Sequence, residues 1–182
     1  ASDRGIDLCE RHFRDPAVAQ ETARALVADP ATDERTRAWA ELTLSFNYLY
    51  FSSMPVDAES GLERARVLFD SVGDRRGQLL TEIGRSRLLI VQQAPEPARE
   101  RLLAIRDEAA VLLPPEDRFW LLNALGATFF YADQIDEAIR YIYQALETLR
   151  AIDLSPQLPT VMSNLAAALV TVGDYAPARE LA

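Results

Sequence analysis

The stretch that decides the fold runs from Leu122 to Glu147 and reads LNALGATFFYADQIDEAIRYIYQALE. It opens with a large residue that is followed three positions later by Leu125-Gly126, and similar quartets return elsewhere in the chain. They are Leu80-x-x-Ile83-Gly84, Met162-x-x-Leu165-Ala166 and, more loosely, Trp39-x-x-Leu42-Thr43, so the pattern repeats every 40 to 42 residues. A fixed period of this size is typical of stacked arrays, in which each unit buries its apolar face against the next.

Nearly the whole chain is predicted to be helical, because apolar residues recur at spacings of three and four and strand signals are absent. The expected helices span residues 16–28, 34–52, 61–72, 76–93, 97–112, 117–131, 134–151, 160–172 and 175–182. Loops are expected over Ser52–Ser60 and Ala94–Pro97, and Pro114-Pro115 is expected to end the helix before it. Short turns between helices predict antiparallel packing of neighbours.

Small residues are expected where the two helices of a pair approach each other. Gly84, Gly126 and Ala166 lie on the first helices, and Ala138 and Ala178 are expected to face them from the second helices. A larger side chain there would separate the helices and lower the packing density that cores require.

The quoted stretch resembles a tetratricopeptide repeat (TPR). The positions that carry the resemblance are Leu122, Leu125, Gly126, Phe129, Ala138, Ile142 and Ala145. Residues 164–178 are similar, with Gly173-Asp174 as the turn. Two departures stand out: the period exceeds the 34 residues of the family, which predicts longer connections between helices, and among the first helices only Trp39 supplies the expected large aromatic residue.

The resemblance implies an all-α fold, a right-handed superhelical array of antiparallel helix pairs (a TPR-like solenoid). We expect one domain over residues 1–182, with N-terminal helices over 1–30 and repeats at about 34–73, 76–113, 117–152 and 159–182. The last repeat is truncated, and the sequence at both ends suggests a piece cut from a longer polypeptide.

Composition narrows the function classes. The net charge of −9 argues against a nucleic-acid partner, because such proteins need clustered cations to displace counterions. All 19 basic residues are Arg, which hints at a bacterial GC-rich genome. The single cysteine, Cys9, fits a reducing, cytoplasmic compartment, and no apolar run approaches the ~18 residues of a membrane span.

The resemblance also implies a regulatory role. The stretch Val72–Gln78 resembles the joint between repeats in bacterial signalling versions of the family, such as the sensory regions of GGDEF diguanylate cyclases, histidine kinases and large transcription activators. We therefore expect a protein-interaction or sensory module that binds a protein, a peptide or a second copy of itself. The alternatives are a structural dimerisation spacer and the regulatory domain of a transcription activator. No enzymatic activity, cofactor or metal is expected for these residues.

The first helices of the pairs would line a concave groove. The residues placed there are Arg37, Asn47, Tyr48, Gln78, Thr81, Arg85, Asn123, Phe130, Tyr131 and Ser163. Arg85 and Asn123 could bind a peptide backbone or carboxylate, because Arg offers a planar fork and Asn both a donor and an acceptor. The alternative is a solvated surface in which Arg85 pairs with Glu82.

Two aromatic clusters, Phe129–Tyr131 and Tyr48–Phe51, cannot direct every ring into one core, so one ring of each could point into the groove or a contact surface. Core packing between successive repeats is the favoured reading, because most aromatic residues lie in cores. Cys9 and His12 are too few for a zinc site, which needs about four ligands. The acids Asp107, Glu108, Glu116 and Asp117 suit a helix surface and helix N-termini.

Overall fold

The computed structural model describes residue 8 and residues 15–52, 54–152 and 158–181, and over these ranges every regular element is a helix. The all-α prediction is confirmed. The chain divides into two compact units, residues 1–91 and 92–182. The expectation of a single domain stays a prediction.

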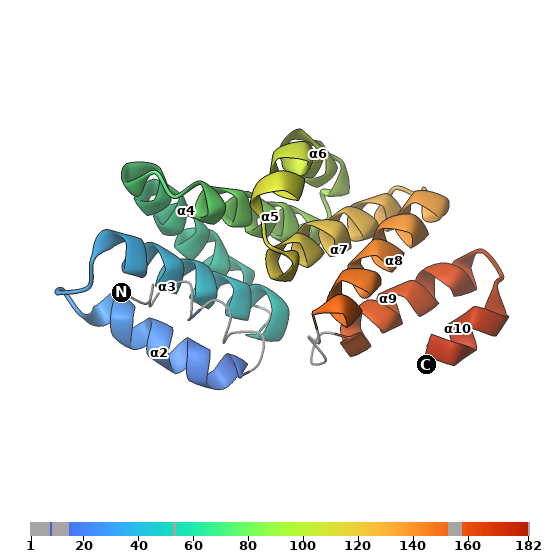
Figure 1. Ribbon diagram of the computed structural model, residues 1–182, viewed down its shortest axis with the longest axis horizontal. Helices are drawn as coiled ribbons and strands as arrows, with labels where there is room; N and C mark the ends of the chain where they lie inside the picture. Colours follow the sequence, from blue (N-terminus) through green and yellow to red (C-terminus); the bar gives the residue numbers. More distant parts are fainter. Residues whose placement is uncertain (1–7, 9–14, 53, 153–157, 182) are drawn as a thin grey trace. The chain divides into compact units, whose positions relative to one another are not determined.

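The N-terminal unit is a run of helices in which each packs on the next (Figure 1). They are α2 (Pro16–Ala28), α3 (Glu34–Asn47), a π-helical turn η1 (Tyr48–Ser52), α4 (Pro55–Val72) and α5 (Arg75–Val91). The α5 helix also contacts α3. This packing leaves α3 almost wholly buried, with 11 of its 14 residues inside the unit's core.

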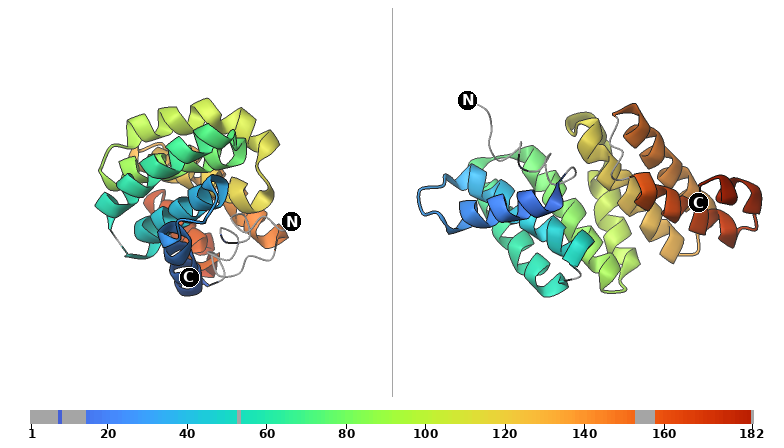
Figure 2. Two further views of the ribbon diagram at one scale, coloured as in Figure 1. Left: turned by 90° about the vertical axis from the view of Figure 1, so that its left-hand side faces the viewer. Right: turned by 90° about the horizontal axis from the view of Figure 1, so that it is seen from below.

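The C-terminal unit has the same plan (Figure 2). Its described helices are α6 (Pro95–Leu112), α7 (Pro115–Tyr131), α8 (Ile135–Ala151), α9 (Leu158–Thr171) and α10 (Tyr175–Leu181). Each packs on the next, and α7 also contacts α9. Both units therefore place consecutive first helices, α3 with α5 and α7 with α9, against each other.

Several prolines open helices where the sequence predicted loops or a stop. The expected loops Ser52–Ser60 and Ala94–Pro97 were wrong in part, because α4 begins at Pro55 and α6 at Pro95. Pro115 likewise begins α7. The first helical position suits proline, since its missing N–H would have no partner inside the helix and its φ is already helical.

The long repeat period comes from long helices. The prediction of long connections was wrong for most joints: three residues join α5 to α6 (92–94) and two join α6 to α7 (113–114). The helices α5 and α6 have 17 and 18 residues, which together already exceed the 34 residues of a typical repeat.

The joint between α4 and α5 is held by one buried carboxylate. Asp74 is 8% exposed and accepts hydrogen bonds from Trp39 Nε1 (3.1 Å), Arg35 Nε (2.9 Å) and the backbone N–H of Gly77 (3.1 Å). The Trp39 ring meets the edge of Phe69 at a centroid distance of 5.1 Å. Asp74 thus caps α5 and ties it to α3.

Glycines mark the close approaches of helices, with one correction. As predicted, Gly126 of α7 faces α8: a Cβ at this position would lie 2.5 Å from Ile142 Cγ1 and 3.4 Å from the carbonyl oxygen of Ala138. Gly84 was expected to meet the second helix of its own pair. It instead faces the preceding pair, with Phe46 of α3 and Leu62 of α4 within 2.8 Å of an added Cβ, because α5 packs on α3 and α4.

In the ranges that the structure describes, no helix combines the length and hydropathy that crossing a bilayer requires.

Candidate functional site

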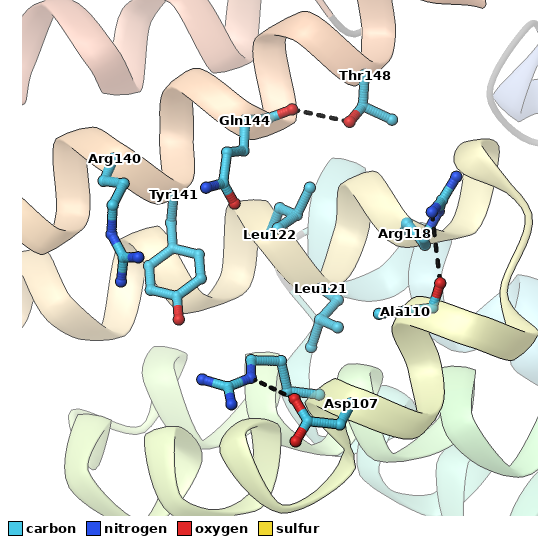
Figure 3. Close-up of a pocket in the computed structure, with 10 residues that line it drawn as sticks. Asp107, Ala110, Arg118, Leu121, Leu122, Arg140, Tyr141, Gln144 and Thr148 are labelled. Atoms are coloured by element: carbon cyan, nitrogen blue, oxygen red, sulfur yellow. Dashed lines mark hydrogen bonds and ion pairs between the residues drawn. The ribbon is translucent and has the colours of Figure 1, made fainter.

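A cleft opens between three helices of the C-terminal unit, with a cavity volume of about 460 Å³ (Figure 3). From α6 it is lined by Arg106, Asp107 and Ala110, and from α7 by Arg118, Leu121 and Leu122. The α8 helix adds Arg140, Tyr141, Gln144 and Thr148. We call these residues the cationic cleft, because they carry three guanidinium groups and one carboxylate in a chain whose net charge is −9.

Helix periodicity brings the lining residues of each helix together. Arg118, Leu121 and Leu122 are three and four positions apart and so share one face of α7. The close contact at Gly126 holds α8 against α7. Phe129 then stacks on Tyr141 across the two helices, with ring centroids 5.3 Å apart and planes inclined by 10°, which fixes the aromatic side of the cleft.

Arg118 is the cation with the weakest internal partner. Its Nη1 donates to the backbone carbonyl oxygen of Ala110 at 3.4 Å, and it forms no ion pair with any residue that the structure describes. Figure 3 shows Arg118 and Arg140 at opposite ends of the cleft, with Leu121 and Leu122 between them. The cations at the two ends of the cleft are therefore separated by two leucines and by the carboxylate of Asp107.

The other two cations are partly engaged. Arg140 binds Glu137 of its own helix through Nε and Nη2, and its guanidinium lies 4.8 Å from the centroid of the Tyr141 ring. Arg106 Nε donates to Asp107 at 2.9 Å. Hydrogen bonding to Asp107, and then to Tyr141, raises the pKa of the Arg106 guanidinium. Arg106 therefore stays charged at any physiological pH.

Three of the residues predicted for the concave groove are used inside the N-terminal unit. Arg37 Nη2 donates to the carbonyl oxygens of Asp29 (3.0 Å) and Thr32 (3.4 Å), which secures the loop before α3. Asn47 is buried, and its Nδ2 donates to the carbonyl oxygen of Pro16 at 3.3 Å. Tyr48 packs, partly buried, on an apolar cluster. That cluster comprises Leu8, Ala19, Ala23, Ala40 and Leu44.

The three predicted groove residues of α5 are also engaged. Gln78 Nε2 donates to Asp70 at 3.0 Å, and its Oε1 accepts from Arg75 at 2.9 Å. Thr81 is fully buried, and its hydroxyl donates to the carbonyl oxygen of Gly77. Arg85 pairs with Glu82 at 3.3 Å, which is the alternative that the sequence left open for it.

Of the four predicted groove residues in the C-terminal unit, one is buried, one is partly buried and two are exposed. Asn123 is buried, and its Oδ1 accepts from Asn164 Nδ2 of α9 at 3.2 Å, so α7 and α9 are linked by a hydrogen bond. Ser163 on α9 is exposed. Phe130 is half-buried, and Tyr131 is 55% exposed with its ring edge-on to Phe130. Tyr131 is therefore the most exposed ring of this cluster, and a contact at its surface stays a prediction.

The sequence did not predict the cationic cleft. Its pattern places Asp107 on an ordinary helix surface and does not single out the three arginines. Their separation along the chain hides them: Arg106, Arg118 and Arg140 lie on three helices and match no short motif. The only available signal was the i, i+3, i+4 spacing of Arg118, Leu121 and Leu122 on α7, which reads equally well as core.

Other predictions have a simpler outcome. Asp117 and Glu116 lie in the first turn of α7, as expected for acids at a helix N-terminus. Cys9 and His12 lie outside the described residues. Over the ranges that the structure does describe, no group of three or more His, Cys, Asp or Glu residues is arranged to hold a metal ion.

Comparisons with known proteins agree with the helix pairing. Residues 117–182, which span α7 to α10, match the family model of the tetratricopeptide repeat. Among solved structures, the chain resembles pilF of Pseudomonas aeruginosa at 22% identity and a TM-score of 0.56, over 97% of this chain and 69% of that one. The fold is TPR-like.

Two solved structures of a putative kinesin light chain from Podosopora anserina, with nearly identical TPR-like repeats, are also similar. Both have 19% identity to this chain, with TM-scores of 0.57 and 0.55 over 97% of this chain and 89% of theirs. No curated protein matches the chain. The TPR-like pairs α7–α8 and α9–α10 are thus recognisable in sequence as well as in structure, whereas for α2 to α6 the likeness is one of fold.

Proposed function

We propose that this chain is a protein-interaction module that binds a peptide segment of a partner on the first helices of its TPR-like pairs. The observation that carries the proposal is the fold itself, with the sequence match over α7 to α10. Stacked helix pairs of this kind present extended surfaces on which other chains dock. The proposal assigns no catalytic activity to these residues.

Binding is centred on the α7–α9 face of the C-terminal unit. There the hydrogen bond between Asn123 and Asn164 links the two helices. Tyr131 and Ser163 are exposed, and the Tyr131 ring lies edge-on to the half-buried Phe130. Tyr and Phe are good interface anchors, because they bury a large area at a small cost in conformational entropy. The corresponding polar groups of the N-terminal unit, Arg85 among them, already hold internal partners.

The test uses the 182-residue chain as bait for a displayed library of random peptides, followed by fluorescence anisotropy with the enriched peptides. Tyr131→Ala is expected to weaken binding by about tenfold or more, as truncation of an anchor does. Tyr143→Ala is the matched control, because Tyr143 is 39% exposed but lies on α8. Failure to enrich any peptide, or equal losses for both variants, would contradict the proposal.

The wider context that we propose is a bacterial signalling protein in which this module controls an attached output domain, such as a diguanylate cyclase. The support is the resemblance of Val72–Gln78 to joints in such proteins and the all-Arg set of basic residues. Sequencing the gene around this segment tests it: a GGDEF, kinase or DNA-binding region would support the context, and an open reading frame without any output domain would contradict it.

A further inference from the structure

We infer that the cationic cleft between α6 and α8 is a second docking site, and that its occupant is an acidic peptide segment of a partner protein with an apolar side chain between its carboxylates. The charge of the lining selects the sign of the occupant. The lining holds three guanidinium groups and one carboxylate, Asp107, which binds Arg106. A second carboxylate, Glu137, binds Arg140 from outside the lining, so these groups together keep an excess of one positive charge.

The arginines retain hydrogen-bonding capacity for such a ligand. Among the described residues, the hydrogen bond of the Arg118 guanidinium goes to the Ala110 carbonyl oxygen at 3.4 Å, so the guanidinium can take a carboxylate in a bidentate pair. Arg140 uses Nε and Nη2 for Glu137, and its Nη1 has no hydrogen-bond partner among the described residues. The two groups lie at opposite ends of the cleft (Figure 3), which suits two carboxylates on one segment.

The middle of the cleft distinguishes a peptide from a free anion. Leu121, which is 2% exposed, and Leu122, which is partly buried, lie between Arg118 and Arg140. Covering the exposed part of Leu122 with an apolar side chain yields roughly 25 cal/mol for each Å² removed from water. The side-chain amide of Gln144 offers a donor and an acceptor for a peptide backbone. A volume of about 460 Å³ falls in the range of about 300–1,000 Å³ for ligand sites, which is enough for a few side chains of a segment.

This site is separate from the surface of the proposed function. At about 3.6 residues per turn, Arg118, Leu121 and Leu122 fall on one side of α7, whereas Asn123 and Phe130 fall on the other, towards α9. Binding at the cationic cleft can therefore be shown or refuted independently of binding at the α7–α9 face.

The test is a fluorescence anisotropy titration of the 182-residue chain with a dye-labelled peptide of alternating Glu and Leu residues. The matched peptides replace every Glu by Gln or every Leu by Ser. The inference predicts saturable binding of the Glu–Leu peptide, and an affinity at least tenfold lower for either matched peptide. Added salt should weaken the binding. Inorganic phosphate at the same concentration as the peptide should have little effect on it. Loss of the Leu dependence, or equal competition by phosphate, would reduce the cleft to a general anion site and overturn the inference.

Variants locate the binding. The double variant Arg118→Gln/Arg140→Gln is expected to lower the affinity for the Glu–Leu peptide by tenfold or more. Arg150→Gln, on the exposed face of α8 outside the cleft, should lower it by less than twofold. Far-UV circular dichroism checks that each variant is folded. A loss that follows Tyr131→Ala instead would move the peptide to the α7–α9 face. That result, an equal loss for Arg150→Gln, or no binding at all would each overturn the inference.

Discussion

The indole nitrogen of Trp39 donates a 3.1 Å hydrogen bond to the carboxylate of Asp74, which follows it by 35 residues. One end of this bond is on α3 and the other is at the start of α5. Both residues are buried, so water cannot replace either partner. The bond therefore joins the first helices of two consecutive pairs and sets the spacing between them.

Asp74→Ala should lower the free energy of unfolding by about 2 kcal/mol, because it leaves Trp39 Nε1 unpaired in the core and removes the cap on Gly77 N. Urea denaturation followed by circular dichroism measures the change. Asp174→Ala is the control: the same Gly-Asp dipeptide precedes α10, but Asp174 is exposed. Similar losses for both variants would show that the buried hydrogen bonds contribute little.

Gly73 and Gly77 should both resist substitution by alanine, for different reasons. Gly73 has φ +66° and open space around it, so Gly73→Ala should cost about 1 kcal/mol through backbone strain alone. Gly77→Ala places a Cβ 2.2 Å from a Phe69 ring carbon and should cost about 1–3 kcal/mol through overpacking.

A second substitution separates these two causes. Phe69→Leu should partly relieve Gly77→Ala and leave the cost of Gly73→Ala unchanged, as judged by double-mutant cycles of unfolding free energy. If Phe69→Leu added the same penalty to both glycine variants, the contact between Gly77 and Phe69 would not be the cause.

The ion pair between Glu41 and Arg64 should be asymmetric. Glu41 has a side chain only 4% exposed and accepts from Arg64 at 2.7 and 2.8 Å, whereas the Arg64 side chain is 56% exposed. Arg64→Met leaves the buried Glu41 carboxylate without its partner and should lower the free energy of unfolding by about 2 kcal/mol. The loss is smaller than for a fully buried pair, because water reaches the Arg64 side.

Two variants test that asymmetry by thermal unfolding. Glu41→Gln/Arg64→Met should be more stable than Arg64→Met alone, because the amide removes the stranded charge. Arg66→Met is the control on the same helix: it breaks the exposed pairs with Glu63 and Asp70 and should change the melting temperature little, because exposed ion pairs contribute little. A double variant less stable than Arg64→Met would contradict the argument.

Acid should weaken the start of α3 through Asp33. The hydrogen bond from the Thr36 backbone N–H (2.9 Å), with that from the Thr36 side chain, lowers the pKa of the Asp33 carboxyl. A lowered folded-state pKa means that the stabilisation is present above the unfolded pKa of about 3.9 and is lost as pH falls through the lower folded value. Unfolding free energies from pH 5 to pH 2 should therefore converge for the wild type and Asp33→Asn, which keeps an acceptor but does not titrate. A difference that is constant with pH would refute this.

Base should weaken the N-terminal unit through Tyr50. Burial raises the pKa of the Tyr50 hydroxyl to about 12, although the nearby charge of Arg87 lowers it. The guanidinium of Arg87 lies 5.3 Å from the centroid of the Tyr50 ring. A raised folded-state pKa gives stability that is complete below the unfolded pKa of about 10 and is lost as pH rises to about 12. The tyrosinate absorbance of the wild type minus that of Tyr50→Phe should titrate near pH 12; a midpoint near 10 would contradict the burial argument.

Much of the fold was predictable because it depends on local periodicity. The contacts of Gly126 with Ala138 and Ile142 follow from residues only 12 and 16 positions apart on one hairpin, and apolar spacing alone places them face to face. Gly84 shows the limit. Its small size does mark a close approach of helices, but its neighbours Phe46 and Leu62 come from the preceding pair, and the repeat pattern does not say which pair a first helix approaches more closely.

The candidate sites divide in the same way. That the rings of Phe129–Tyr131 cannot all enter one core could be inferred, because three successive residues do not share one face of a helix; that Tyr131 is the exposed ring could not. The burial of Thr81 and the internal hydrogen bonds of Arg37 and Asn47 could not, because they depend on how α2, α3 and α5 pack. The ten predicted groove residues as a binding surface stay a prediction.

The amino-acid sequence by itself determined that this protein is built from antiparallel helix pairs, since helical periodicity, turn glycines and repeat spacing act over a few residues. Only the tertiary structure decided which charges meet. Arg106, Arg118 and Arg140 meet in one cleft through the packing of three successive helices, and Asp74 meets Trp39 through the packing of α5 on α3. Electrostatic and hydrogen-bonding energies depend on distances between such groups in space, and no local pattern encodes those distances.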